Sequence, residues 1–154
     1  MRGMALETVL LAVGPKDSGR VDRLAEAAIE VAEPAEATVV LGHVFTEEEY
    51  DEALDRLGFD PDSEESTPDG VAKRHATIRE LVGGLDAVGV NHDIRGSVGE
   101  HARSIVEMAT RAGADRVIVS GRQRRPSGKA VFGSTAQEVL LTAPCPVTFV
   151  RVDD

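Results

Sequence analysis

The sequence lacks the residues on which several classes of protein depend. Its 154 residues include one cysteine, Cys145, which excludes a disulfide framework and a zinc site built from cysteines. No apolar run approaches the ~20 residues that a membrane-spanning helix requires, and the longest near the start is Val9–Val13. The first residues show no hydrophobic region with a cleavage site, so we expect a cytoplasmic protein with no membrane partner.

The remaining composition is that of a single globular domain. Hydrophobic residues make up 42% of the chain and charged residues 29%. A chain of this length buries about 70% of the surface that its unfolded form exposes, so a full core needs neither disulfides nor a metal. We therefore expect one domain that spans residues 1–154.

The net charge of −10 comes from one block of the chain. Residues 46–70 hold eleven acidic residues and one base, Arg56, and the rest of the chain is neutral. One acidic block argues against nucleic acid as a partner, because nucleic-acid binding requires a basic face. Glu47–Leu57 could form some helix, but residues 58–70 are too polar and too rich in glycine and proline to stay ordered alone. We expect an acidic, flexible insertion at about residues 46–70, outside the core.

Hydrophobic periodicity predicts alternating strands and helices. Short apolar or β-branched runs predict five strands, at Thr8–Val13, Thr38–Phe45, Val90–Arg95, Arg116–Val119 and Val147–Val150. Apolar residues at helical spacing predict four helices, at about Arg20–Glu33 (with Asp17 or Ser18 as the N-cap), Val71–Val88, Glu100–Ala112 and Ser134–Leu141. This alternation predicts an α/β fold: a doubly wound, mainly parallel, five-stranded sheet in three layers, covered by helices on both faces.

Two loops at the carboxyl ends of the predicted strands form the candidate site. Ligands of doubly wound sheets bind at these ends, where the strand order reverses. Both loops contain glycine and cationic residues, and the second leads into a helix whose first N–H groups favour anions. The candidate phosphate- or nucleotide-binding residues are Gly14, Pro15, Lys16, Gly121, Arg122, Ser127, Gly128, Lys129, Gly133, Ser134 and Thr135. On the alternative interpretation, Ser134 only caps the helix and the arginines are solvated.

Motifs of other sites are missing. No P-loop, no Gly-x-Gly-x-x-Gly fingerprint and no Gly-x-Ser-x-Gly elbow occurs, and no nucleophile lies beside a base. His43, His75, His92 and His101 lie on separate predicted elements without ligand spacing, so we interpret each as structural or solvated. We expect no catalytic residue and no metal site.

Four segments carry a resemblance to a known family. Leu41–Val44, Gly113–Val119, Gly133–Leu140 and Ala143–Val147 resemble the signature segments of the universal stress protein family. The resemblance implies the strand order 3-2-1-4-5 of the adenine-nucleotide alpha-hydrolase-like (HUP) fold. It also implies a homodimer paired through the last strand, Val147–Val150, and an ATP or AMP site between the first and fourth strands, with Mg²⁺ accompanying ATP.

The chain departs from the family pattern at that site. Members that bind ATP carry Gly-x2-Gly-x9-Gly-Ser/Thr, but Ser120 and Gln123 stand at the first two glycine positions here. The first strand usually ends in Asp, and Gly14 takes that place. Two functions follow: a dimeric module in stress signalling that binds ATP, AMP or another phosphate-bearing ligand, or an interaction protein with a degenerate site that binds no nucleotide. An enzyme is the weaker alternative, with slow ATP hydrolysis at most, because Lys16–Gly19 only faintly resembles the phosphate loop of enzymes with this fold.

Overall fold

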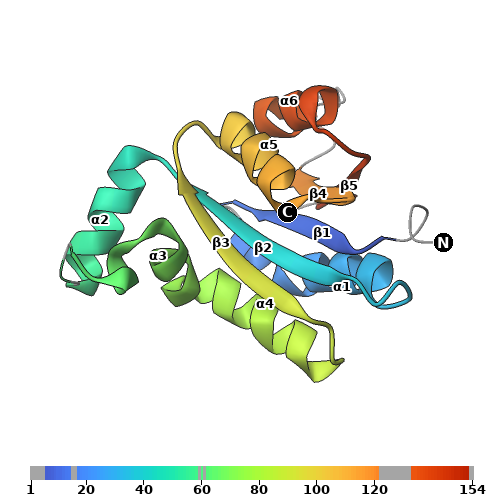
Figure 1. Cartoon of the computed structure of the whole chain (residues 1–154), viewed down its shortest axis with the longest axis horizontal. Coiled ribbons are helices and arrows are strands. Elements are labelled where there is room, and N and C mark those ends of the chain that lie inside the picture. The colour runs from blue at the N-terminus through green and yellow to red at the C-terminus, as the bar shows by residue number, and fades with distance from the viewer. Residues whose placement is uncertain (1–5, 15–16, 59, 61, 122–132, 153–154) are drawn as a thin grey trace.

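A single parallel sheet organises the chain in the computed structural model, which describes residues 6–14, 17–58, 60, 62–121 and 133–152. Five strands pair in the order β3-β2-β1-β4-β5, and every pairing is parallel (Figure 1). Their bounds are β1 Thr8–Val13, β2 Thr38–Phe45, β3 His92–Val98, β4 Arg116–Gly121 and β5 Val147–Arg151. The predicted doubly wound α/β fold and strand order are confirmed. Six predicted site residues lie outside the described residues: Pro15 and Lys16, and four within residues 122–132.

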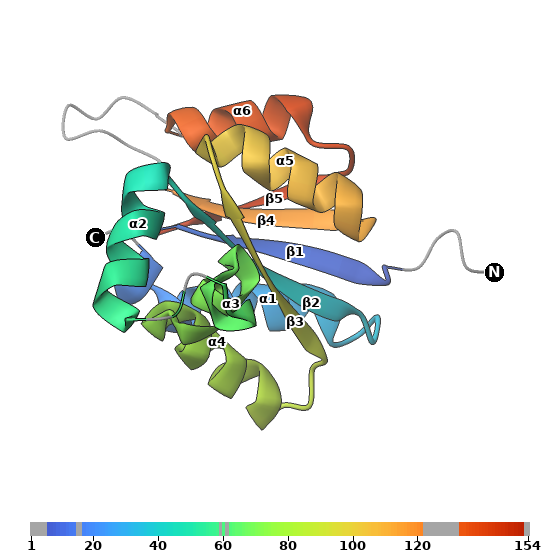
Figure 2. The same cartoon turned by 60° about the vertical axis from the view of Figure 1, so that its left-hand side comes forward.

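Helices cover both faces of the sheet because side chains of the central strand alternate between them. Val9 and Leu11 of β1 face α1 (Val21–Ala32) and α4 (Ala76–Ala87), whereas Leu10 faces α5 (His101–Ala112) and α6 (Ser134–Thr142). Figures 1 and 2 show the two layers of helices on opposite sides of the strands. A strand that is buried on both faces must be apolar at every position, which explains the uninterrupted run at Val9–Val13.

Two predicted helices begin or end elsewhere. The first begins at Val21 with Arg20 at the N-cap, so the prediction of Asp17 or Ser18 as the cap is wrong. Asp17 instead lies in a short 3-10 turn, Asp17–Gly19, where its carboxylate contacts the end of β1. The predicted helix Val71–Val88 is two helices, α3 (Pro68–Arg74) and α4, because the backbone of His75 is extended between them.

The acidic block folds against the sheet. It contains α2 (Glu47–Leu57), a 3-10 turn at Glu64–Ser66 and the start of α3. The expectation that it lies outside the core is wrong, because the acids occupy one side of α2 while Ala53 is buried beside Phe45, Val71 and Ala72. Thr46 and Glu49 close α2 with a capping box. Flexibility of residues 46–70 stays a prediction, and hydrogen exchange as slow there as in β1 would contradict it.

The two edges of the sheet differ. The edge strand β3, which runs a few residues later than the predicted Val90–Arg95, is covered by α3, whose Asp69 carboxylate accepts a hydrogen bond from Gly96 N at 2.7 Å. At the other edge, β5 pairs with β4 on one side only within the described chain. Covering an edge strand prevents pairing with a second chain, so β5 is the edge that this fold leaves open.

Candidate functional site

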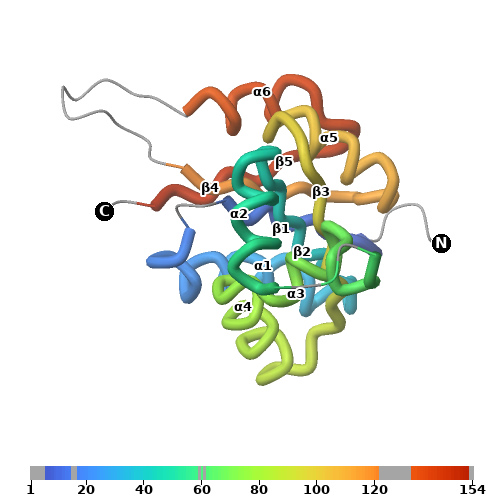
Figure 3. Tube along the Cα trace, turned by 90° about the vertical axis from the view of Figure 1, so that its left-hand side faces the viewer, coloured from blue at the N-terminus to red at the C-terminus, as the bar shows by residue number. Residues whose placement is uncertain are grey.

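The carboxyl ends of β1 and β4 form the point where the strand order of the sheet reverses. The chain leaves β1 toward β2 on one side, and β4 leads to β5 on the other. Figure 3 views the molecule from the side on which the strands end, and Figure 2 shows that α6 begins on the same side. Helix N-termini and diverging loops converge at such a point, which is why doubly wound sheets bind their ligands there.

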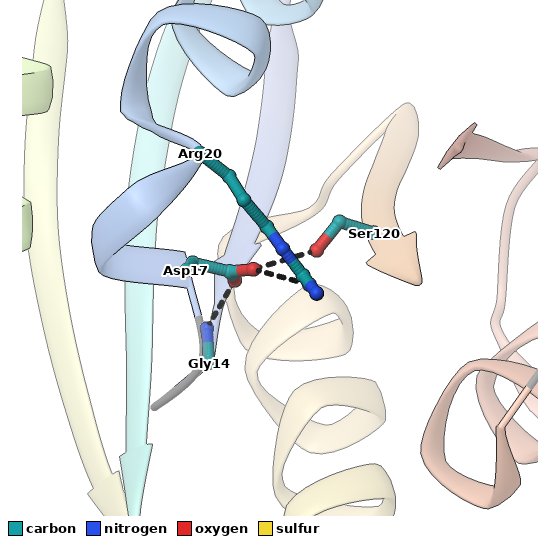
Figure 4. A network of polar contacts seen from close by, with 4 residues as sticks. All are labelled: Gly14, Asp17, Arg20 and Ser120. Atoms are coloured by element: carbon teal, nitrogen blue, oxygen red, sulfur yellow. Dashed lines mark hydrogen bonds and ion pairs between the residues drawn. The ribbon is translucent and has the colours of Figure 1, made fainter. Parts of the chain in front are cut away.

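A buried carboxylate joins the two strand ends. Asp17 is only 3% exposed, and its Oδ2 accepts a hydrogen bond from Gly14 N at 2.7 Å. Its Oδ1 accepts a hydrogen bond from Ser120 Oγ at 2.9 Å and lies 3.4 Å from Arg20 Nη1 (Figure 4). A buried charge requires such partners, and here they come from the end of β1, the end of β4 and the start of α1.

Sequence reasoning missed Asp17 as a site residue. Its position suggested a helix cap, and Gly14 was the only residue considered for the acidic position at the end of β1. The available signal was an acid three residues beyond a buried strand, in a loop too short to carry that acid far from the strand end. An aspartate in such a loop hydrogen-bonds backbone N–H groups nearby, and here the nearest one belongs to Gly14.

The N-terminus of α6 has no side-chain cap. Gly133 is the N-cap residue, with φ of 82° and ψ of 150°, and it makes no side-chain cap hydrogen bond. Ser134 is already the first helical residue, so the alternative that Ser134 serves as the cap is wrong. Gly133 and Ser134 are exposed and Thr135 is half-buried. The first N–H groups of a helix and the helix dipole make such a terminus favourable for an anion.

The structure places five of the predicted binding residues. Gly14 follows β1, Gly121 ends β4, and Gly133, Ser134 and Thr135 open α6. Pro15, Lys16, Arg122, Ser127, Gly128 and Lys129 lie outside the described residues. Of the residues in the described ranges, no group of three or more His, Cys, Asp or Glu is arranged to hold a metal ion.

Three histidines that the sequence separates come together at the same edge of the sheet. His43 lies near the end of β2, His75 joins α3 to α4, and His101 begins α5. The ring centroids of His43 and His75 are 4.3 Å apart, and His101 Nε2 is 3.7 Å from a carboxylate oxygen of Glu49. The interpretation of the histidines as structural holds for His43, which is 4% exposed and packs against Phe45 and His75, but the sequence did not predict that the topology brings the ends of β2 and β3 and the start of α4 together.

Comparison with known proteins gives the relationship. The sequence model described as the universal stress protein family matches residues 6–151. The chain belongs to the universal stress protein family. A universal stress protein of Mycolicibacterium smegmatis is 32% identical over 79 residues, which are 51% of this chain and 61% of that protein. The alignment thus spans less than two thirds of the length of that relative.

Solved structures of universal stress proteins share the fold. One from Archaeoglobus fulgidus is 23% identical, with a TM-score of 0.68 over 94% of this chain and 98% of that one. A universal stress protein in complex with cAMP is 20% identical, with a TM-score of 0.65 over 97% and 99% of the two chains. A family protein from Arabidopsis thaliana with AMP bound is 14% identical, with a TM-score of 0.61 over 96% and 92%. Among the described helices of this family member, none is long and apolar enough to cross a membrane.

Proposed function

We propose that this protein is a dimeric universal stress protein module of the cytoplasm that binds ATP, AMP or another phosphate-bearing ligand at the ends of β1 and β4. The observation that carries the proposal is the uncapped N-terminus of α6, at Gly133, on the same edge of the sheet as the buried Asp17 carboxylate. The start of α6 favours a negatively charged group, and the Asp17 carboxylate is a hydrogen-bond acceptor. A nucleotide carries both complementary parts: phosphate oxygens, and the donors of ribose and base.

The phosphate end of the proposed site is the start of α6. Ser134 and Thr135 offer hydroxyl and backbone N–H donors, and Gly133 leaves the backbone open to close approach. In this proposal Lys129 and Arg122 supply positive charge, Ser127 supplies a further hydroxyl donor, Gly128 leaves room for close backbone approach, and Mg²⁺ would accompany ATP.

The nucleoside end of the proposed site is Asp17. Its Oδ2 accepts one hydrogen bond, from Gly14 N, and has capacity for another, whereas its Oδ1 accepts from both Ser120 Oγ and Arg20. The carboxylate would therefore accept from a ribose hydroxyl or a base amino group, the role that the resemblance gives to an Asp at the position of Gly14. Relatives solved with cAMP and with AMP support a nucleotide as the ligand class.

Native mass spectrometry of the freshly purified protein tests this function. We expect a fraction of molecules to carry an added mass that acid treatment releases as an adenine nucleotide. A chain that carries no added mass, and takes none up from millimolar ATP or AMP, contradicts the proposal and favours the alternative of an interaction protein with a degenerate site.

Ser134→Ala should weaken nucleotide binding about tenfold or more, because one hydrogen bond to a charged phosphate contributes about 1.5–3 kcal/mol. Thr142→Ala is the matched control, since it removes a hydroxyl from the other end of α6, where that group bonds only the Glu138 carbonyl. Equilibrium binding of a fluorescent ATP analogue measures both. Equal affinities of the two variants would exclude the start of α6 from the site.

The proposed dimer forms by pairing of β5 with its copy. The bonds from Val117 N to Pro146 O and from Val152 N to Gly121 O direct the peptide groups of even-numbered residues toward β4. The N–H of Val147 therefore points to the open edge. Leu141, at 77% exposure on the preceding helix, adds apolar surface for a partner to cover.

Val147→Pro should convert the dimer to a monomer, because it removes a donor from the open edge. Proline is tolerated at the first residue of a strand, so β5 itself should persist. Val147→Ile, which keeps the N–H, should elute as the dimer. Light scattering coupled to size exclusion gives the mass of each, and a dimeric Val147→Pro would exclude this edge as the interface.

A further inference from the structure

A cluster of three histidines lies where α2 meets the carboxyl ends of the strands, here called the carboxyl edge of the sheet. The cluster consists of His43 on β2, His75 between α3 and α4, and His101 at the start of α5. Glu49 of α2 faces it, with its carboxylate 3.7 Å from His101 Nε2. Figures 2 and 3 show α2 across the carboxyl ends of the strands. Nothing in the proposed nucleotide site uses these residues.

His43 is buried in this cluster, and one of its two ring nitrogens lacks a hydrogen-bond partner among the described residues. Its side chain is 4% exposed, and the nitrogen without a partner in the described part of the chain is Nδ1. The ring lies edge-on to Phe45, with centroids 4.5 Å apart, and its centroid is 4.3 Å from that of His75. A buried polar atom without a partner is rare, because it costs the free energy of its lost hydration.

Protonation of two members of the cluster, His43 and His75, is disfavoured in the folded protein. Burial, followed by the charge of His75, lowers the pKa of His43 to about 4, although a backbone hydrogen bond to Val13 and the charge of Glu49 act in the opposite direction. Burial and then the neighbouring charge of Arg56 lower the pKa of His75. Both side chains are therefore held neutral at pH 7 by the contacts of the folded protein.

The carboxylates near the cluster do not offset the positive charge that several protonated histidines would carry. Glu49 already accepts a hydrogen bond from Thr46 N at 2.8 Å, and chiefly this bond lowers the pKa of its carboxyl group. Glu100, next to His101, is fully exposed and accepts from two backbone N–H groups of α5. Arg56 adds a positive charge from α2. A second proton in the cluster thus meets like charge at short range.

We propose that the three histidines form a proton-operated latch, in which uptake of more than one proton releases α2 from the carboxyl edge of the sheet. Among the described residues, the apolar contacts of α2 belong to one small cluster, centred on Phe45, Ala53, Val71 and Ala72. An element with so few apolar contacts can open without unfolding the core. Release lets water reach His43 and separates the charges, so the open form binds protons that the closed form excludes.

The direction of the pH dependence follows from these pKa values. In the open form His43 and His75 have ordinary pKa values near 6.5, whereas the closed form lowers the pKa of His75 and holds that of His43 at about 4. The closed form is fully favoured above pH 6.5, and that preference is lost as the pH falls from 6.5 toward 4.

Tyr50 provides an intrinsic fluorescence probe of the position of α2. Tyr50 is the single tyrosine of a sequence without tryptophan, and its hydroxyl donates to the Ser66 carbonyl oxygen. Tyrosine fluorescence of the full chain from pH 8 to pH 4 therefore reports whether α2 is docked. We expect a transition between pH 6.5 and 4 that is steeper than one proton allows, while the amides of β1 stay protected from hydrogen exchange.

Variants separate the latch from a general effect of acid. His43→Phe should lower the midpoint by about half a pH unit or more and make the transition less steep, and so should His75→Asn, which keeps an acceptor at the N-cap of α4. His92→Gln removes the histidine outside the cluster and should leave the transition unchanged. The latch is excluded if Tyr50 shows no change down to pH 4, if β1 loses protection at the same pH, or if the folded cluster variants behave as wild type.

Discussion

Gly96→Ala should destabilise the protein by about 4 kcal/mol, a large part of the stability of a domain this size. A Cβ atom at Gly96 would overlap the carbonyl oxygen of Pro68, which belongs to the backbone and cannot turn aside. The first turn of α3 must therefore move away from β3. That movement breaks the hydrogen bond from Gly96 N to Asp69 and exposes Val71 and Ala72. Urea unfolding followed by far-ultraviolet circular dichroism measures the loss.

Gly83→Ala is the matched control for this substitution. Gly83 lies in α4, and a Cβ atom there meets nothing within 4 Å. The same chemical change should stabilise the protein by about 0.5–1 kcal/mol, because alanine restricts the unfolded chain and favours the helix. Effects of the same sign at both positions would show that α3 does not rest against β3 as described.

Asp17→Ala should cost about 3 kcal/mol of stability, since it removes an acceptor from Gly14 N and from Ser120 Oγ at once. Both donors belong to strand ends that the carboxylate joins, so their amides should also exchange faster with solvent. Nucleotide affinity should fall in parallel if Asp17 binds the nucleoside.

Asp22→Ala provides the comparison for Asp17. Asp22 is exposed in the first turn of α1, where a carboxylate gains less than about 1 kcal/mol from the helix dipole. Urea unfolding of both variants at pH 7 separates the two effects. Equal losses at Asp17 and Asp22 would mean that the buried network does not stabilise the ends of β1 and β4.

The sheet could be predicted from the sequence because a strand that is buried on both faces is apolar at every position. Val9–Val13 is apolar at every position, and the helix now seen at His101–Ala112 repeats its apolar residues at helical spacing. A helix over Glu47–Leu57 was also visible in the sequence, since Tyr50, Ala53, Leu54 and Leu57 recur at helical spacing. Its packing against Phe45, Val71 and Ala72 was not, because Ala53 is the only buried residue of α2 and the acids around it give the segment the composition of an unstructured one.

The site was predicted only where a local motif exists. Gly133 and Ser134 stand in the order that a helix start requires, and the structure places them there. Asp17 and the histidine cluster depend on contacts between distant segments: Asp17 bonds Ser120 across 103 positions, and the cluster combines residues from three elements. Spacing along the chain carries no information on such contacts, since the strand order of the folded sheet creates them.

Calorimetric titration of ATP, AMP and inorganic phosphate into the purified protein tests the nucleotide site most directly. Gly133→Val introduces a side chain at the proposed phosphate end, at φ of 82° and ψ of 150°, and Gly113→Val introduces the same side chain at another positive φ, 64° with ψ of 38°, beyond α5. Apart from the chain neighbours, no atom of the described residues lies within 4 Å of an added Cβ at either position. We expect wild type and Gly113→Val to bind nucleotide with the same affinity and Gly133→Val to bind at least about tenfold more weakly. Absence of binding heat from wild type with every ligand at millimolar concentration, or equal affinity of the two valine variants, would contradict a nucleotide site at the ends of β1 and β4.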